Sequence, residues 1–311
     1  MRVFSLILLI SILFSTFAHA QSFQDLRQRL IERTKSQQDP YKDEYSELKA
    51  SVRFPEPIYQ DERFLLVDNL RDLGGKGAEG IDSPVWKSAL IDTHKVKRVV
   101  WMMCVFVIKA GPIKYNAGHA QMVFEFEEGG AVLADRELQG IVSSFEILPK
   151  KGVGYDPIGK GMSKYYNNSC TLSSKQFSFL ASASRDSRIE LYTLDLTREE
   201  MVELLKISLR EALDKESIKK NKYHTTRNSC VTNQFRILNL FLPEEIRIPE
   251  WTKVFGLKIL RTFGTIVPRR VGKTLKKHGL VKGEEIYECP DEAMQYIKKI
   301  SQQAIFKELY E

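Results

Sequence analysis

The chain has 311 residues, a formal net charge of +7 at pH 7 and a hydrophobic content of 43%. This length can bury one large or two small hydrophobic cores, and the composition is ordinary for a globular protein. The chain contains no internal repeat and no low-complexity tract, which excludes repeat architectures and long disordered proteins.

Residues 1–20 have the pattern of a cleaved secretory signal peptide. Arg2 is followed by an unbroken apolar run, and an A-x-A motif at residues 18–20 precedes Gln21. A lipoprotein would carry a cysteine where Gln21 stands, and no later stretch has the roughly 18 apolar residues that a membrane span requires. We therefore expect cleavage near Ala20 and a soluble, periplasmic or secreted protein.

Residues 21–96 are expected to form an N-terminal extension that is partly helical and partly irregular. A helix is predicted over residues 22–36, before Pro40. Residues 41–96 give a mixed pattern with a Gly-rich loop, LGGKGAEG. The apolar residues of the predicted helix are Phe23, Leu26, Leu30 and Ile31.

Residues 97–148 predict a group of β-strands. The apolar run at 97–108 is typical of a buried central strand, and 110–118 is expected to be a loop. The alternating segment AQMVFEFE, the turn at Glu128, Gly129 and Gly130, and the segment AVLADREL together predict an antiparallel hairpin. Residues 141–148 are expected to add a further strand.

Residues 188–243 predict one strand followed by two capped helices. Residues 188–196 alternate, and Thr197 with Glu200 forms a capping box before an apolar stripe. For the second helix, Asn228 or Ser229 is the expected N-cap, and Pro243 ends the run. The expected fold class is α+β, an antiparallel sheet with helices packed on one side. The apolar stripe of the first helix consists of Met201, Leu204, Leu205, Leu209 and Leu213, and that of the second helix consists of Val231, Phe235, Leu238 and Leu242.

Four cysteines follow the predicted signal. Cys104 lies in the apolar run and is expected in the core. Cys170 and Cys289 lie in loop-like contexts, so they are the better candidates for a disulfide in an oxidising compartment. Cys230 is then expected to be free. No C-x-x-C spacing and no cluster of ligands is present, so neither a metal nor another cofactor is expected.

Cys230 is a candidate nucleophile because it stands in the first turn of the second helix. Unpaired N–H groups and the macrodipole favour a thiolate there, and such a nucleophile needs a base, usually histidine. His119 is the best-placed base, since a glycine precedes it and a strand begins with it. The alternatives are a buried helix thiol and a surface histidine at a strand entry. The other histidines after the signal are His94, His224 and His278.

The order of these elements resembles the Lnb N-terminal periplasmic domain family of exported bacterial proteins. That family is in turn similar to the circularly permuted, NlpC-type branch of the papain-like superfamily, in which histidine precedes cysteine. The resemblance implies a permuted papain-like core over residues 97–243. It rests on Gly118, His119 and Ala120, on the strand and helix start RIELYTLDLTREE, and on Tyr223 to Leu238 with Asn228, Cys230 and Thr232.

The resemblance implies a catalytic dyad of Cys230 and His119. The thiolate would attack an amide or ester carbonyl of the cell envelope, in peptidoglycan, lipid or protein, as a hydrolase or acyltransferase. The start of the helix, with Asn228 and Ser229 at its cap, would form the oxyanion site. Ser229 separates asparagine from cysteine, whereas the family pattern joins them. The third, orienting residue is open among Glu137, Asp135, Gln121 and Asn116.

Residues 244–311 are expected to form a basic, helical C-terminal region. Nine lysines and arginines and no acidic residue lie between Trp251 and Gly283, interleaved with apolar residues. This pattern is typical of binding to an anionic membrane surface or an acidic polymer, or of a solvated basic helix face. Nucleic acid is not an expected partner. Two functional classes therefore follow from the sequence, a cysteine hydrolase or acyltransferase and a non-catalytic envelope module with a structural Cys230.

Overall fold

The structure is a computed structural model, and it describes the chain in separate stretches. The predicted signal peptide, Pro40, most of LGGKGAEG and Cys289 lie outside the described residues. The helix and strand bounds given below refer to these stretches. The described stretches are residues 22–36, 53–74, 84–110, 113–148, 159–163, 166–183, 188–225, 227–248, 251–254, 257–260 and 269–288.

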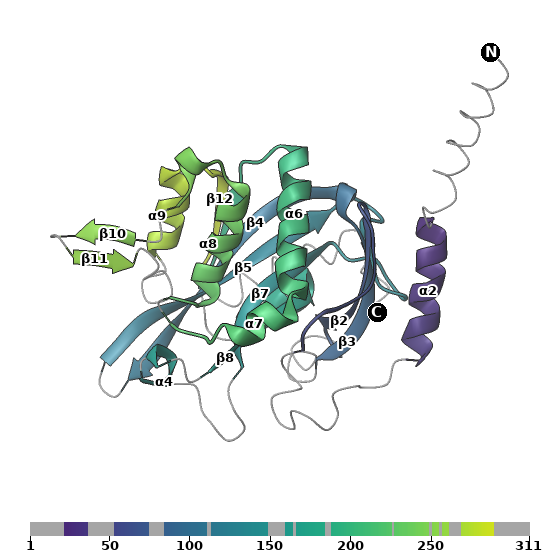
Figure 1. Ribbon diagram of the computed structural model, residues 1–311, viewed down its shortest axis with the longest axis horizontal. Coiled ribbons are helices and arrows are strands. Elements are labelled where there is room, and N and C mark those ends of the chain that lie inside the picture. Colours follow the sequence, from purple (N-terminus) through teal and green to yellow (C-terminus); the bar gives the residue numbers. More distant parts are fainter. Residues whose placement is uncertain are drawn as a thin grey trace, which may run out of the picture.

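Within these residues, ten strands form one sheet in the order β12-β9-β4-β5-β7-β8-β2-β3-β6, with β1 paired to β2. All neighbouring strands are antiparallel except β2 and β8. The hairpin of β10 and β11 stands apart from this sheet (Figure 1). The strands are β1 Glu56–Gln60, β2 Phe64–Asp72, β3 Val85–Asp92, β4 Val96–Ala110, β5 Ile113–Phe126, β6 Ala131–Val132, β7 Gly140–Leu148, β8 Asn167–Ser174, β9 Arg188–Leu194, β10 Trp251–Val254, β11 Leu257–Leu260 and β12 Val281–Tyr287.

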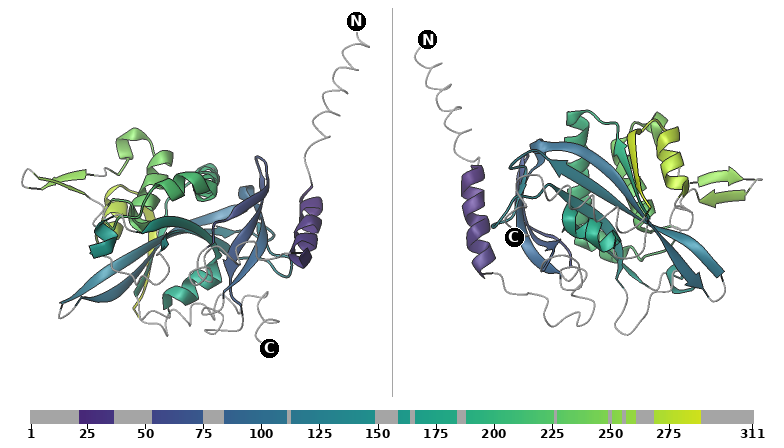
Figure 2. Two further views of the ribbon diagram at one scale, coloured as in Figure 1. Left: turned by 60° about the horizontal axis from the view of Figure 1, so that its bottom comes forward. Right: turned by 180° about the vertical axis from the view of Figure 1, so that it is seen from behind.

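Helices cover both faces of this sheet. We call the side packed against α6 and α8 the helix face, and the other side the α5 face (Figures 1 and 2). On the α5 face, Phe179 and Leu180 pack against Met102 and Val142, and α2 packs there against β2 and β3. The expectation of helices on one side is therefore wrong. The helices are α2 Phe23–Ser36, α4 Gly159–Met162, α5 Lys175–Ala183, α6 Arg198–Leu213, α7 Lys215–Lys220, α8 Cys230–Phe241 and α9 Arg269–Lys277, with 3-10 turns at Thr93–Lys95 and Glu244–Ile246.

A long hairpin of β4 and β5 forms the centre of the sheet. Its register runs from Val96 opposite Phe126 to Ala110 opposite Ile113. The buried strand predicted at 97–108 is confirmed. The loop predicted at 110–118 is wrong, because backbone groups from residue 113 onward pair with β4. Polar and glycine residues indicated a loop there, but the ladder continues through them.

The segment AVLADREL does not return beside β5. Its first residues form β6, which pairs with β3, while β7 is the antiparallel neighbour of β5. A tight loop fixes this path, since Leu138 N–H donates to Ala131 O at 2.8 Å and both side chains are buried. Arg136 also bonds both carboxylate oxygens of Asp72 at 2.6 Å. The predicted hairpin is therefore wrong, whereas the strand predicted at 141–148 is confirmed.

The boundary expected at residue 96 does not separate the sheet from an extension. The strands β2 and β3 belong to the same sheet, and Leu65, Val67 and Leu70 contribute to the main core. Arg71 reaches across β8 to Glu146 on β7, with 2.6 Å between Nη2 and Oε1. Only the helix predicted at 22–36 matches the expected description of this part.

The two predicted helix starts after β9 are confirmed. Thr197 caps α6 and exchanges hydrogen bonds with Glu200. Ser229 caps α8 in the same way with Thr232, and α8 ends two residues before Pro243. Strands from 97–148 and 188–196 do form one antiparallel arrangement with α8 packed against β5 and β7.

The C-terminal region is less helical than expected. It contributes the β10–β11 hairpin, the short α9 and the edge strand β12 of the large sheet. α9 lies close to β9, since a Cβ at Gly272 would come within 2.1 Å of the Tyr192 hydroxyl. The structure describes the side chains of five of the nine basic residues between Trp251 and Gly283. All five side chains are exposed: Arg270, Lys273, Lys276, Lys277 and Lys282. No helix among the described residues is long and apolar enough to cross a membrane.

Candidate functional site

Cys230 is the first residue of α8 and lies on the helix face of the sheet. Its thiol contacts the backbone of β5, with 3.8 Å between Sγ and the carbonyl oxygen of Gly118. Cys230 belongs to the main hydrophobic core together with Ala120 and Met103. The start of α8 therefore lies over the middle of β5, beside the position of His119, and not over the start of that strand.

Burial dominates the chemistry of this thiol. Cys230 is 4% exposed. Removal from water raises the pKa of the Cys230 thiol to about 11, although backbone N–H groups of Ala120 and Val231 act to lower it. The helix start should favour a thiolate, but at this position desolvation is the larger effect. The thiol is therefore protonated at neutral pH and is a poor nucleophile.

His119 lies on the α5 face, opposite Cys230. His119 pairs across the ladder with Cys104, and the next pair is Ala120 with Met103. Ala120 and Met103 belong to the core beneath Cys230, so strand alternation directs Cys104 and His119 to the other side. There the Nε2 atom of His119 lies 2.9 Å from Ser144 Oγ.

The expected Cys230–His119 dyad is therefore wrong in this structure. Both residues lie at the same place along β5, but the sheet separates their side chains. The backbone of Gly118 and Ala120 stands between the thiol and the imidazole. A base must reach the proton that it removes at hydrogen-bond distance or through one water. That geometry is not met.

The hydrogen bond between His119 and Ser144 does not replace the dyad. A serine beside a histidine is the arrangement of an activated hydroxyl nucleophile. Ser144, however, is 1% exposed and lies on the central strand β7, so a substrate carbonyl cannot approach its Oγ. This contact satisfies two polar groups within the sheet.

The four candidates for the orienting residue lie in different places. Gln121 is on the same face as His119, and its backbone is opposite Ser144. Asp135 lies in the loop after β6 and bonds Lys87 at 2.8 Å. Partial burial acts to raise the pKa of Asp135, but Lys87 lowers it below its ordinary value. Glu137 accepts a hydrogen bond from the Gly129 N–H at 2.9 Å.

Asp135 and Glu137 are therefore wrong as orienting residues, because β7 and not AVLADREL runs beside β5. Asn116 is exposed on β5 and pairs with Val107. The predicted oxyanion residues serve the fold instead. Asn228 donates to the carbonyl of Lys222 at 2.8 Å, and Ser229 is the N-cap of α8.

The disulfide expected for Cys170 is wrong. Cys170 is free and buried in β8, 3.8 Å from Ser143 Oγ, and burial raises the pKa of its thiol to about 12. The Asn-Asn-Ser sequence before it suggested a loop, but residues 168–174 are all buried in a strand. Cys104 is a buried core residue as predicted.

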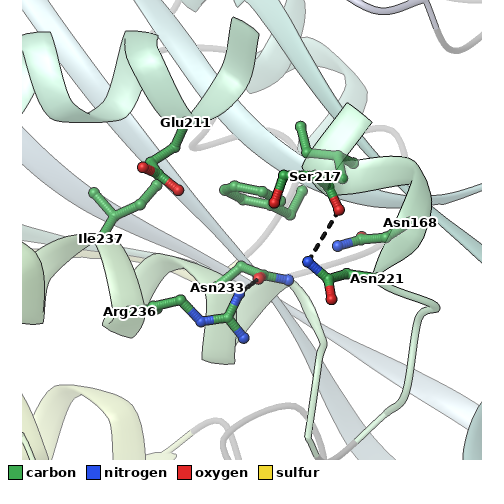
Figure 3. Close-up of a pocket in the computed structure, with 9 residues that line it drawn as sticks. Asn168, Glu211, Ser217, Asn221, Asn233, Arg236 and Ile237 are labelled. Carbon is green, nitrogen blue, oxygen red and sulfur yellow. Dashed lines mark hydrogen bonds between the residues drawn. The ribbon is translucent and has the colours of Figure 1, made fainter. Parts of the chain in front are cut away.

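A polar pocket on the helix face was missed by the sequence analysis. It lies where α6, α7 and α8 meet the start of β8 (Figure 3), and it is a recess with room for about one water molecule. The spacing of Asn233, Arg236 and Ile237 places three lining residues on one side of α8, which is a signal that the sequence carried. The contribution of Asn168 could not be read, because its strand resembled a loop.

Among the described residues, no group of three or more histidine, cysteine, aspartate and glutamate side chains could hold a metal ion. Comparison of the chain with models of known families, with curated proteins and with solved structures found no match. The resemblance to the Lnb N-terminal domain family therefore rests on the short motifs and on the order of elements. What the geometry establishes is a mixed α/β protein with a large, mostly antiparallel sheet.

Proposed function

We propose that this chain is a non-catalytic protein of the cell envelope, which acts by binding, with Cys230 as a structural thiol. The observation that carries the proposal is the position of the thiol against the Gly118 carbonyl, buried and on the face opposite His119. The predicted signal peptide supports export, and the predicted fold relationship is compatible with an accessory module on an enzyme-like scaffold.

A structural thiol has a simple physical role at this position. Cysteine behaves as a small apolar side chain that can be fully buried and can donate a weak hydrogen bond. Here it fills the space between the first turn of α8 and β5, where the small residues Gly118 and Ala120 allow close approach. A longer side chain at residue 230 would push the helix away from the sheet.

Site-resolved alkylation tests the proposal. The folded protein is treated with iodoacetamide at pH 6.5 and pH 8, digested, and each cysteine is quantified by mass spectrometry. We expect Cys230 to be modified as slowly as the buried Cys170, with fast modification of both in denaturant. The rate at Cys230 should be the same in the His119→Ala variant.

The opposite outcome is a reactive Cys230 whose alkylation depends on His119. Fast alkylation of Cys230 at pH 6.5 that slows in His119→Ala would require a thiolate held by the imidazole. That result would overturn the structural role and restore the cysteine hydrolase or acyltransferase. Cys170 serves as the internal control for unfolding, because any global opening would expose both thiols together.

A further inference from the structure

One side of α9 presents a row of basic side chains to solvent. The opposite side is held to the body by Val271 and Leu275, which are buried in the main core. The basic residues recur at three- and four-residue spacing, which places them on one side of the helix. All of them are exposed, and none forms an ion pair within the part of the chain that the structure describes. They are Arg270, Lys273 and Lys277.

Exposed basic side chains elsewhere on the molecule are often paired with a carboxylate. Arg63 is half exposed and lies 2.7 Å from Asp92. Arg198 is also half exposed and lies 2.7 Å from Glu127. The row on α9 lacks such partners, and no acidic residue occurs between residues 251 and 283. Its positive potential is therefore available to an anionic partner.

Two exposed apolar side chains lie close to the C-terminal end of α9. Leu240 on α8 is 52% exposed, and Ile246 in the following 3-10 turn is 40% exposed. This turn contacts the end of α9, since His278 Nδ1 lies 3.1 Å from the carbonyl oxygen of Ile246. It also folds back on α8, where Asn239 bonds both backbone polar groups of Ile248. We call these two apolar residues and the three basic residues the α9 surface: Leu240, Ile246, Arg270, Lys273 and Lys277.

The hairpin of β10 and β11 projects from the body beside α9 (Figures 1 and 2). Its strands pair with each other and not with the described strands of the large sheet. Thr252 is opposite Ile259. Val254 is opposite Leu257, two positions further along, so these four residues share one face of the hairpin. An isolated two-stranded hairpin is at best marginally stable in water, so contact with an apolar phase would stabilise this one.

We infer that the α9 surface and the β10–β11 hairpin bind an anionic lipid bilayer. The basic residues would lie among the headgroups, and the exposed apolar residues and the apolar hairpin face would enter the boundary with the acyl chains. A soluble acidic polymer would neutralise the cations but would offer no apolar phase. A bilayer offers both. This inference rests on the proposed function as a binding protein and names its partner.

Vesicle co-sedimentation of the folded chain tests the inference. The chain is purified after export, because a retained apolar signal peptide would itself bind lipid. The vesicles consist of phosphatidylcholine alone or with about one third phosphatidylglycerol. We expect saturable binding to the anionic vesicles and little to the neutral ones. Binding should weaken between about 0.1 M and about 0.5 M salt, because salt screens the cations.

Two double variants separate the α9 surface from net charge. Lys273→Gln with Lys277→Gln removes two charges from α9. Arg27→Gln with Arg29→Gln is its matched control, because it removes two charges from exposed positions of α2, on the opposite side of the molecule (Figures 1 and 2). Each basic residue near an anionic surface strengthens binding by roughly fivefold. We therefore expect the α9 variant to bind at least about tenfold more weakly and the α2 variant to bind like the parent chain.

A second matched pair tests the apolar part of the surface. Leu240→Ser removes an exposed apolar side chain from α8, and we expect binding to the anionic vesicles to weaken severalfold. Val107→Ser is the control, because Val107 is exposed to a similar extent, 55%, on β4. It should bind like the parent chain. Circular dichroism confirms that each variant is folded.

The inference is overturned if the anionic vesicles do not bind the chain. Equal weakening by the α9 and α2 variants would also overturn it, because net charge alone would then explain binding. So would soluble polyglutamate that binds as tightly as the vesicles while Leu240→Ser changes nothing, since the partner would be an acidic polymer. None of these results depends on Cys230. A failed vesicle test leaves the structural thiol in place, and a reactive thiol leaves the vesicle test intact.

Discussion

The two faces of the sheet at β5 differ in chemistry although they share one backbone. On the helix face, Cys230, Ala120 and Met103 form part of a dry apolar core. On the α5 face, His119 of β5 bonds Ser144 of the neighbouring β7, and Glu146 of β7 bonds Arg71 of β2, so polar contacts lie beside the apolar cluster of that face. The comparison teaches that a cysteine and a histidine can lie at the same position along a strand, on opposite faces of the sheet, without contact between their side chains.

A difference of one residue decides which face a side chain occupies. Positions 118 and 120 of β5 face the helix face and position 119 faces the α5 face, because successive positions alternate along a strand. A dyad would need the histidine to stand at residue 118 or 120. The comparison between the two faces can be tested through the stability of variants on each.

The largest effect is expected in the apolar core of the helix face. Trp101 is completely buried and contacts the ring of Phe235, with centroids 4.7 Å apart. We predict that Trp101→Ala lowers the free energy of unfolding by about 3–5 kcal/mol, because it leaves a large cavity. Urea denaturation followed by circular dichroism measures this. A loss below about 1 kcal/mol would contradict the packing of α8 on β4.

The buried thiol predicts a pH dependence on the same face. The pKa of Cys230 is raised from 9.0 to about 11, so the unfolded chain releases its proton first as pH rises. The folded state binds more protons between these values, and its stability must fall across pH 9 to 11. Full loss would cost roughly 2–3 kcal/mol.

The Cys230→Ala variant isolates this contribution from that of other groups titrating at high pH. We predict that its free energy of unfolding falls less steeply between pH 9 and pH 11 than that of the parent chain, as measured by urea denaturation at several pH values. Parallel curves for the two proteins would show that Cys230 is not buried as a neutral thiol.

The two capping boxes provide a smaller, matched comparison. Ser229 is fully buried at the start of α8, whereas Thr197 is exposed at the start of α6. We predict that Ser229→Ala lowers the free energy of unfolding by about 1–2 kcal/mol and Thr197→Ala by about 0.5–1 kcal/mol. The difference arises because water can bond the backbone N–H groups left without a cap at the exposed start of α6, but not at the buried start of α8. Thermal and urea denaturation of both variants give the order, and a reversed order would contradict the burial of the α8 start.

The smallest effect is expected at Gln121 on the α5 face. Gln121 is buried, and its Oε1 atom has no hydrogen-bond partner among the described residues. We predict that Gln121→Met changes the free energy of unfolding by less than about 0.5 kcal/mol or increases it, since an unsatisfied acceptor is replaced by an apolar group. A loss above about 2 kcal/mol in urea denaturation would indicate a hydrogen bond that requires glutamine.

Local signals predicted much of the fold. The capping boxes at Thr197 and Ser229 and the apolar strand of Trp101 and Met103 are determined by nearby residues, so their sequence patterns were sufficient. Strands β2 and β8 were missed because their ends are rich in polar residues that pair only with distant partners. Arg71 with Glu146 is such a pair.

The candidate site could be predicted only in part. The sequence placed Cys230 at a helix start, which is confirmed. It placed His119 at the start of a strand, which is wrong, because His119 lies in the middle of β5. It could not reveal which face of β5 packs against α8, since that depends on long-range register. Nor could it reveal the pocket, which needs β8, α6, α7 and α8 to come together around Asn168.

The protonation state of Cys230 tests the separation of the two faces most directly. Cysteine labelled with ¹³C at Cβ reports thiol and thiolate through its NMR chemical shift. We predict that the Cys230 signal of the folded chain does not titrate below pH 9, and that it is the same in His119→Ala, since burial raises its pKa to about 11. A thiolate signal below pH 7 that is lost in His119→Ala would contradict the account.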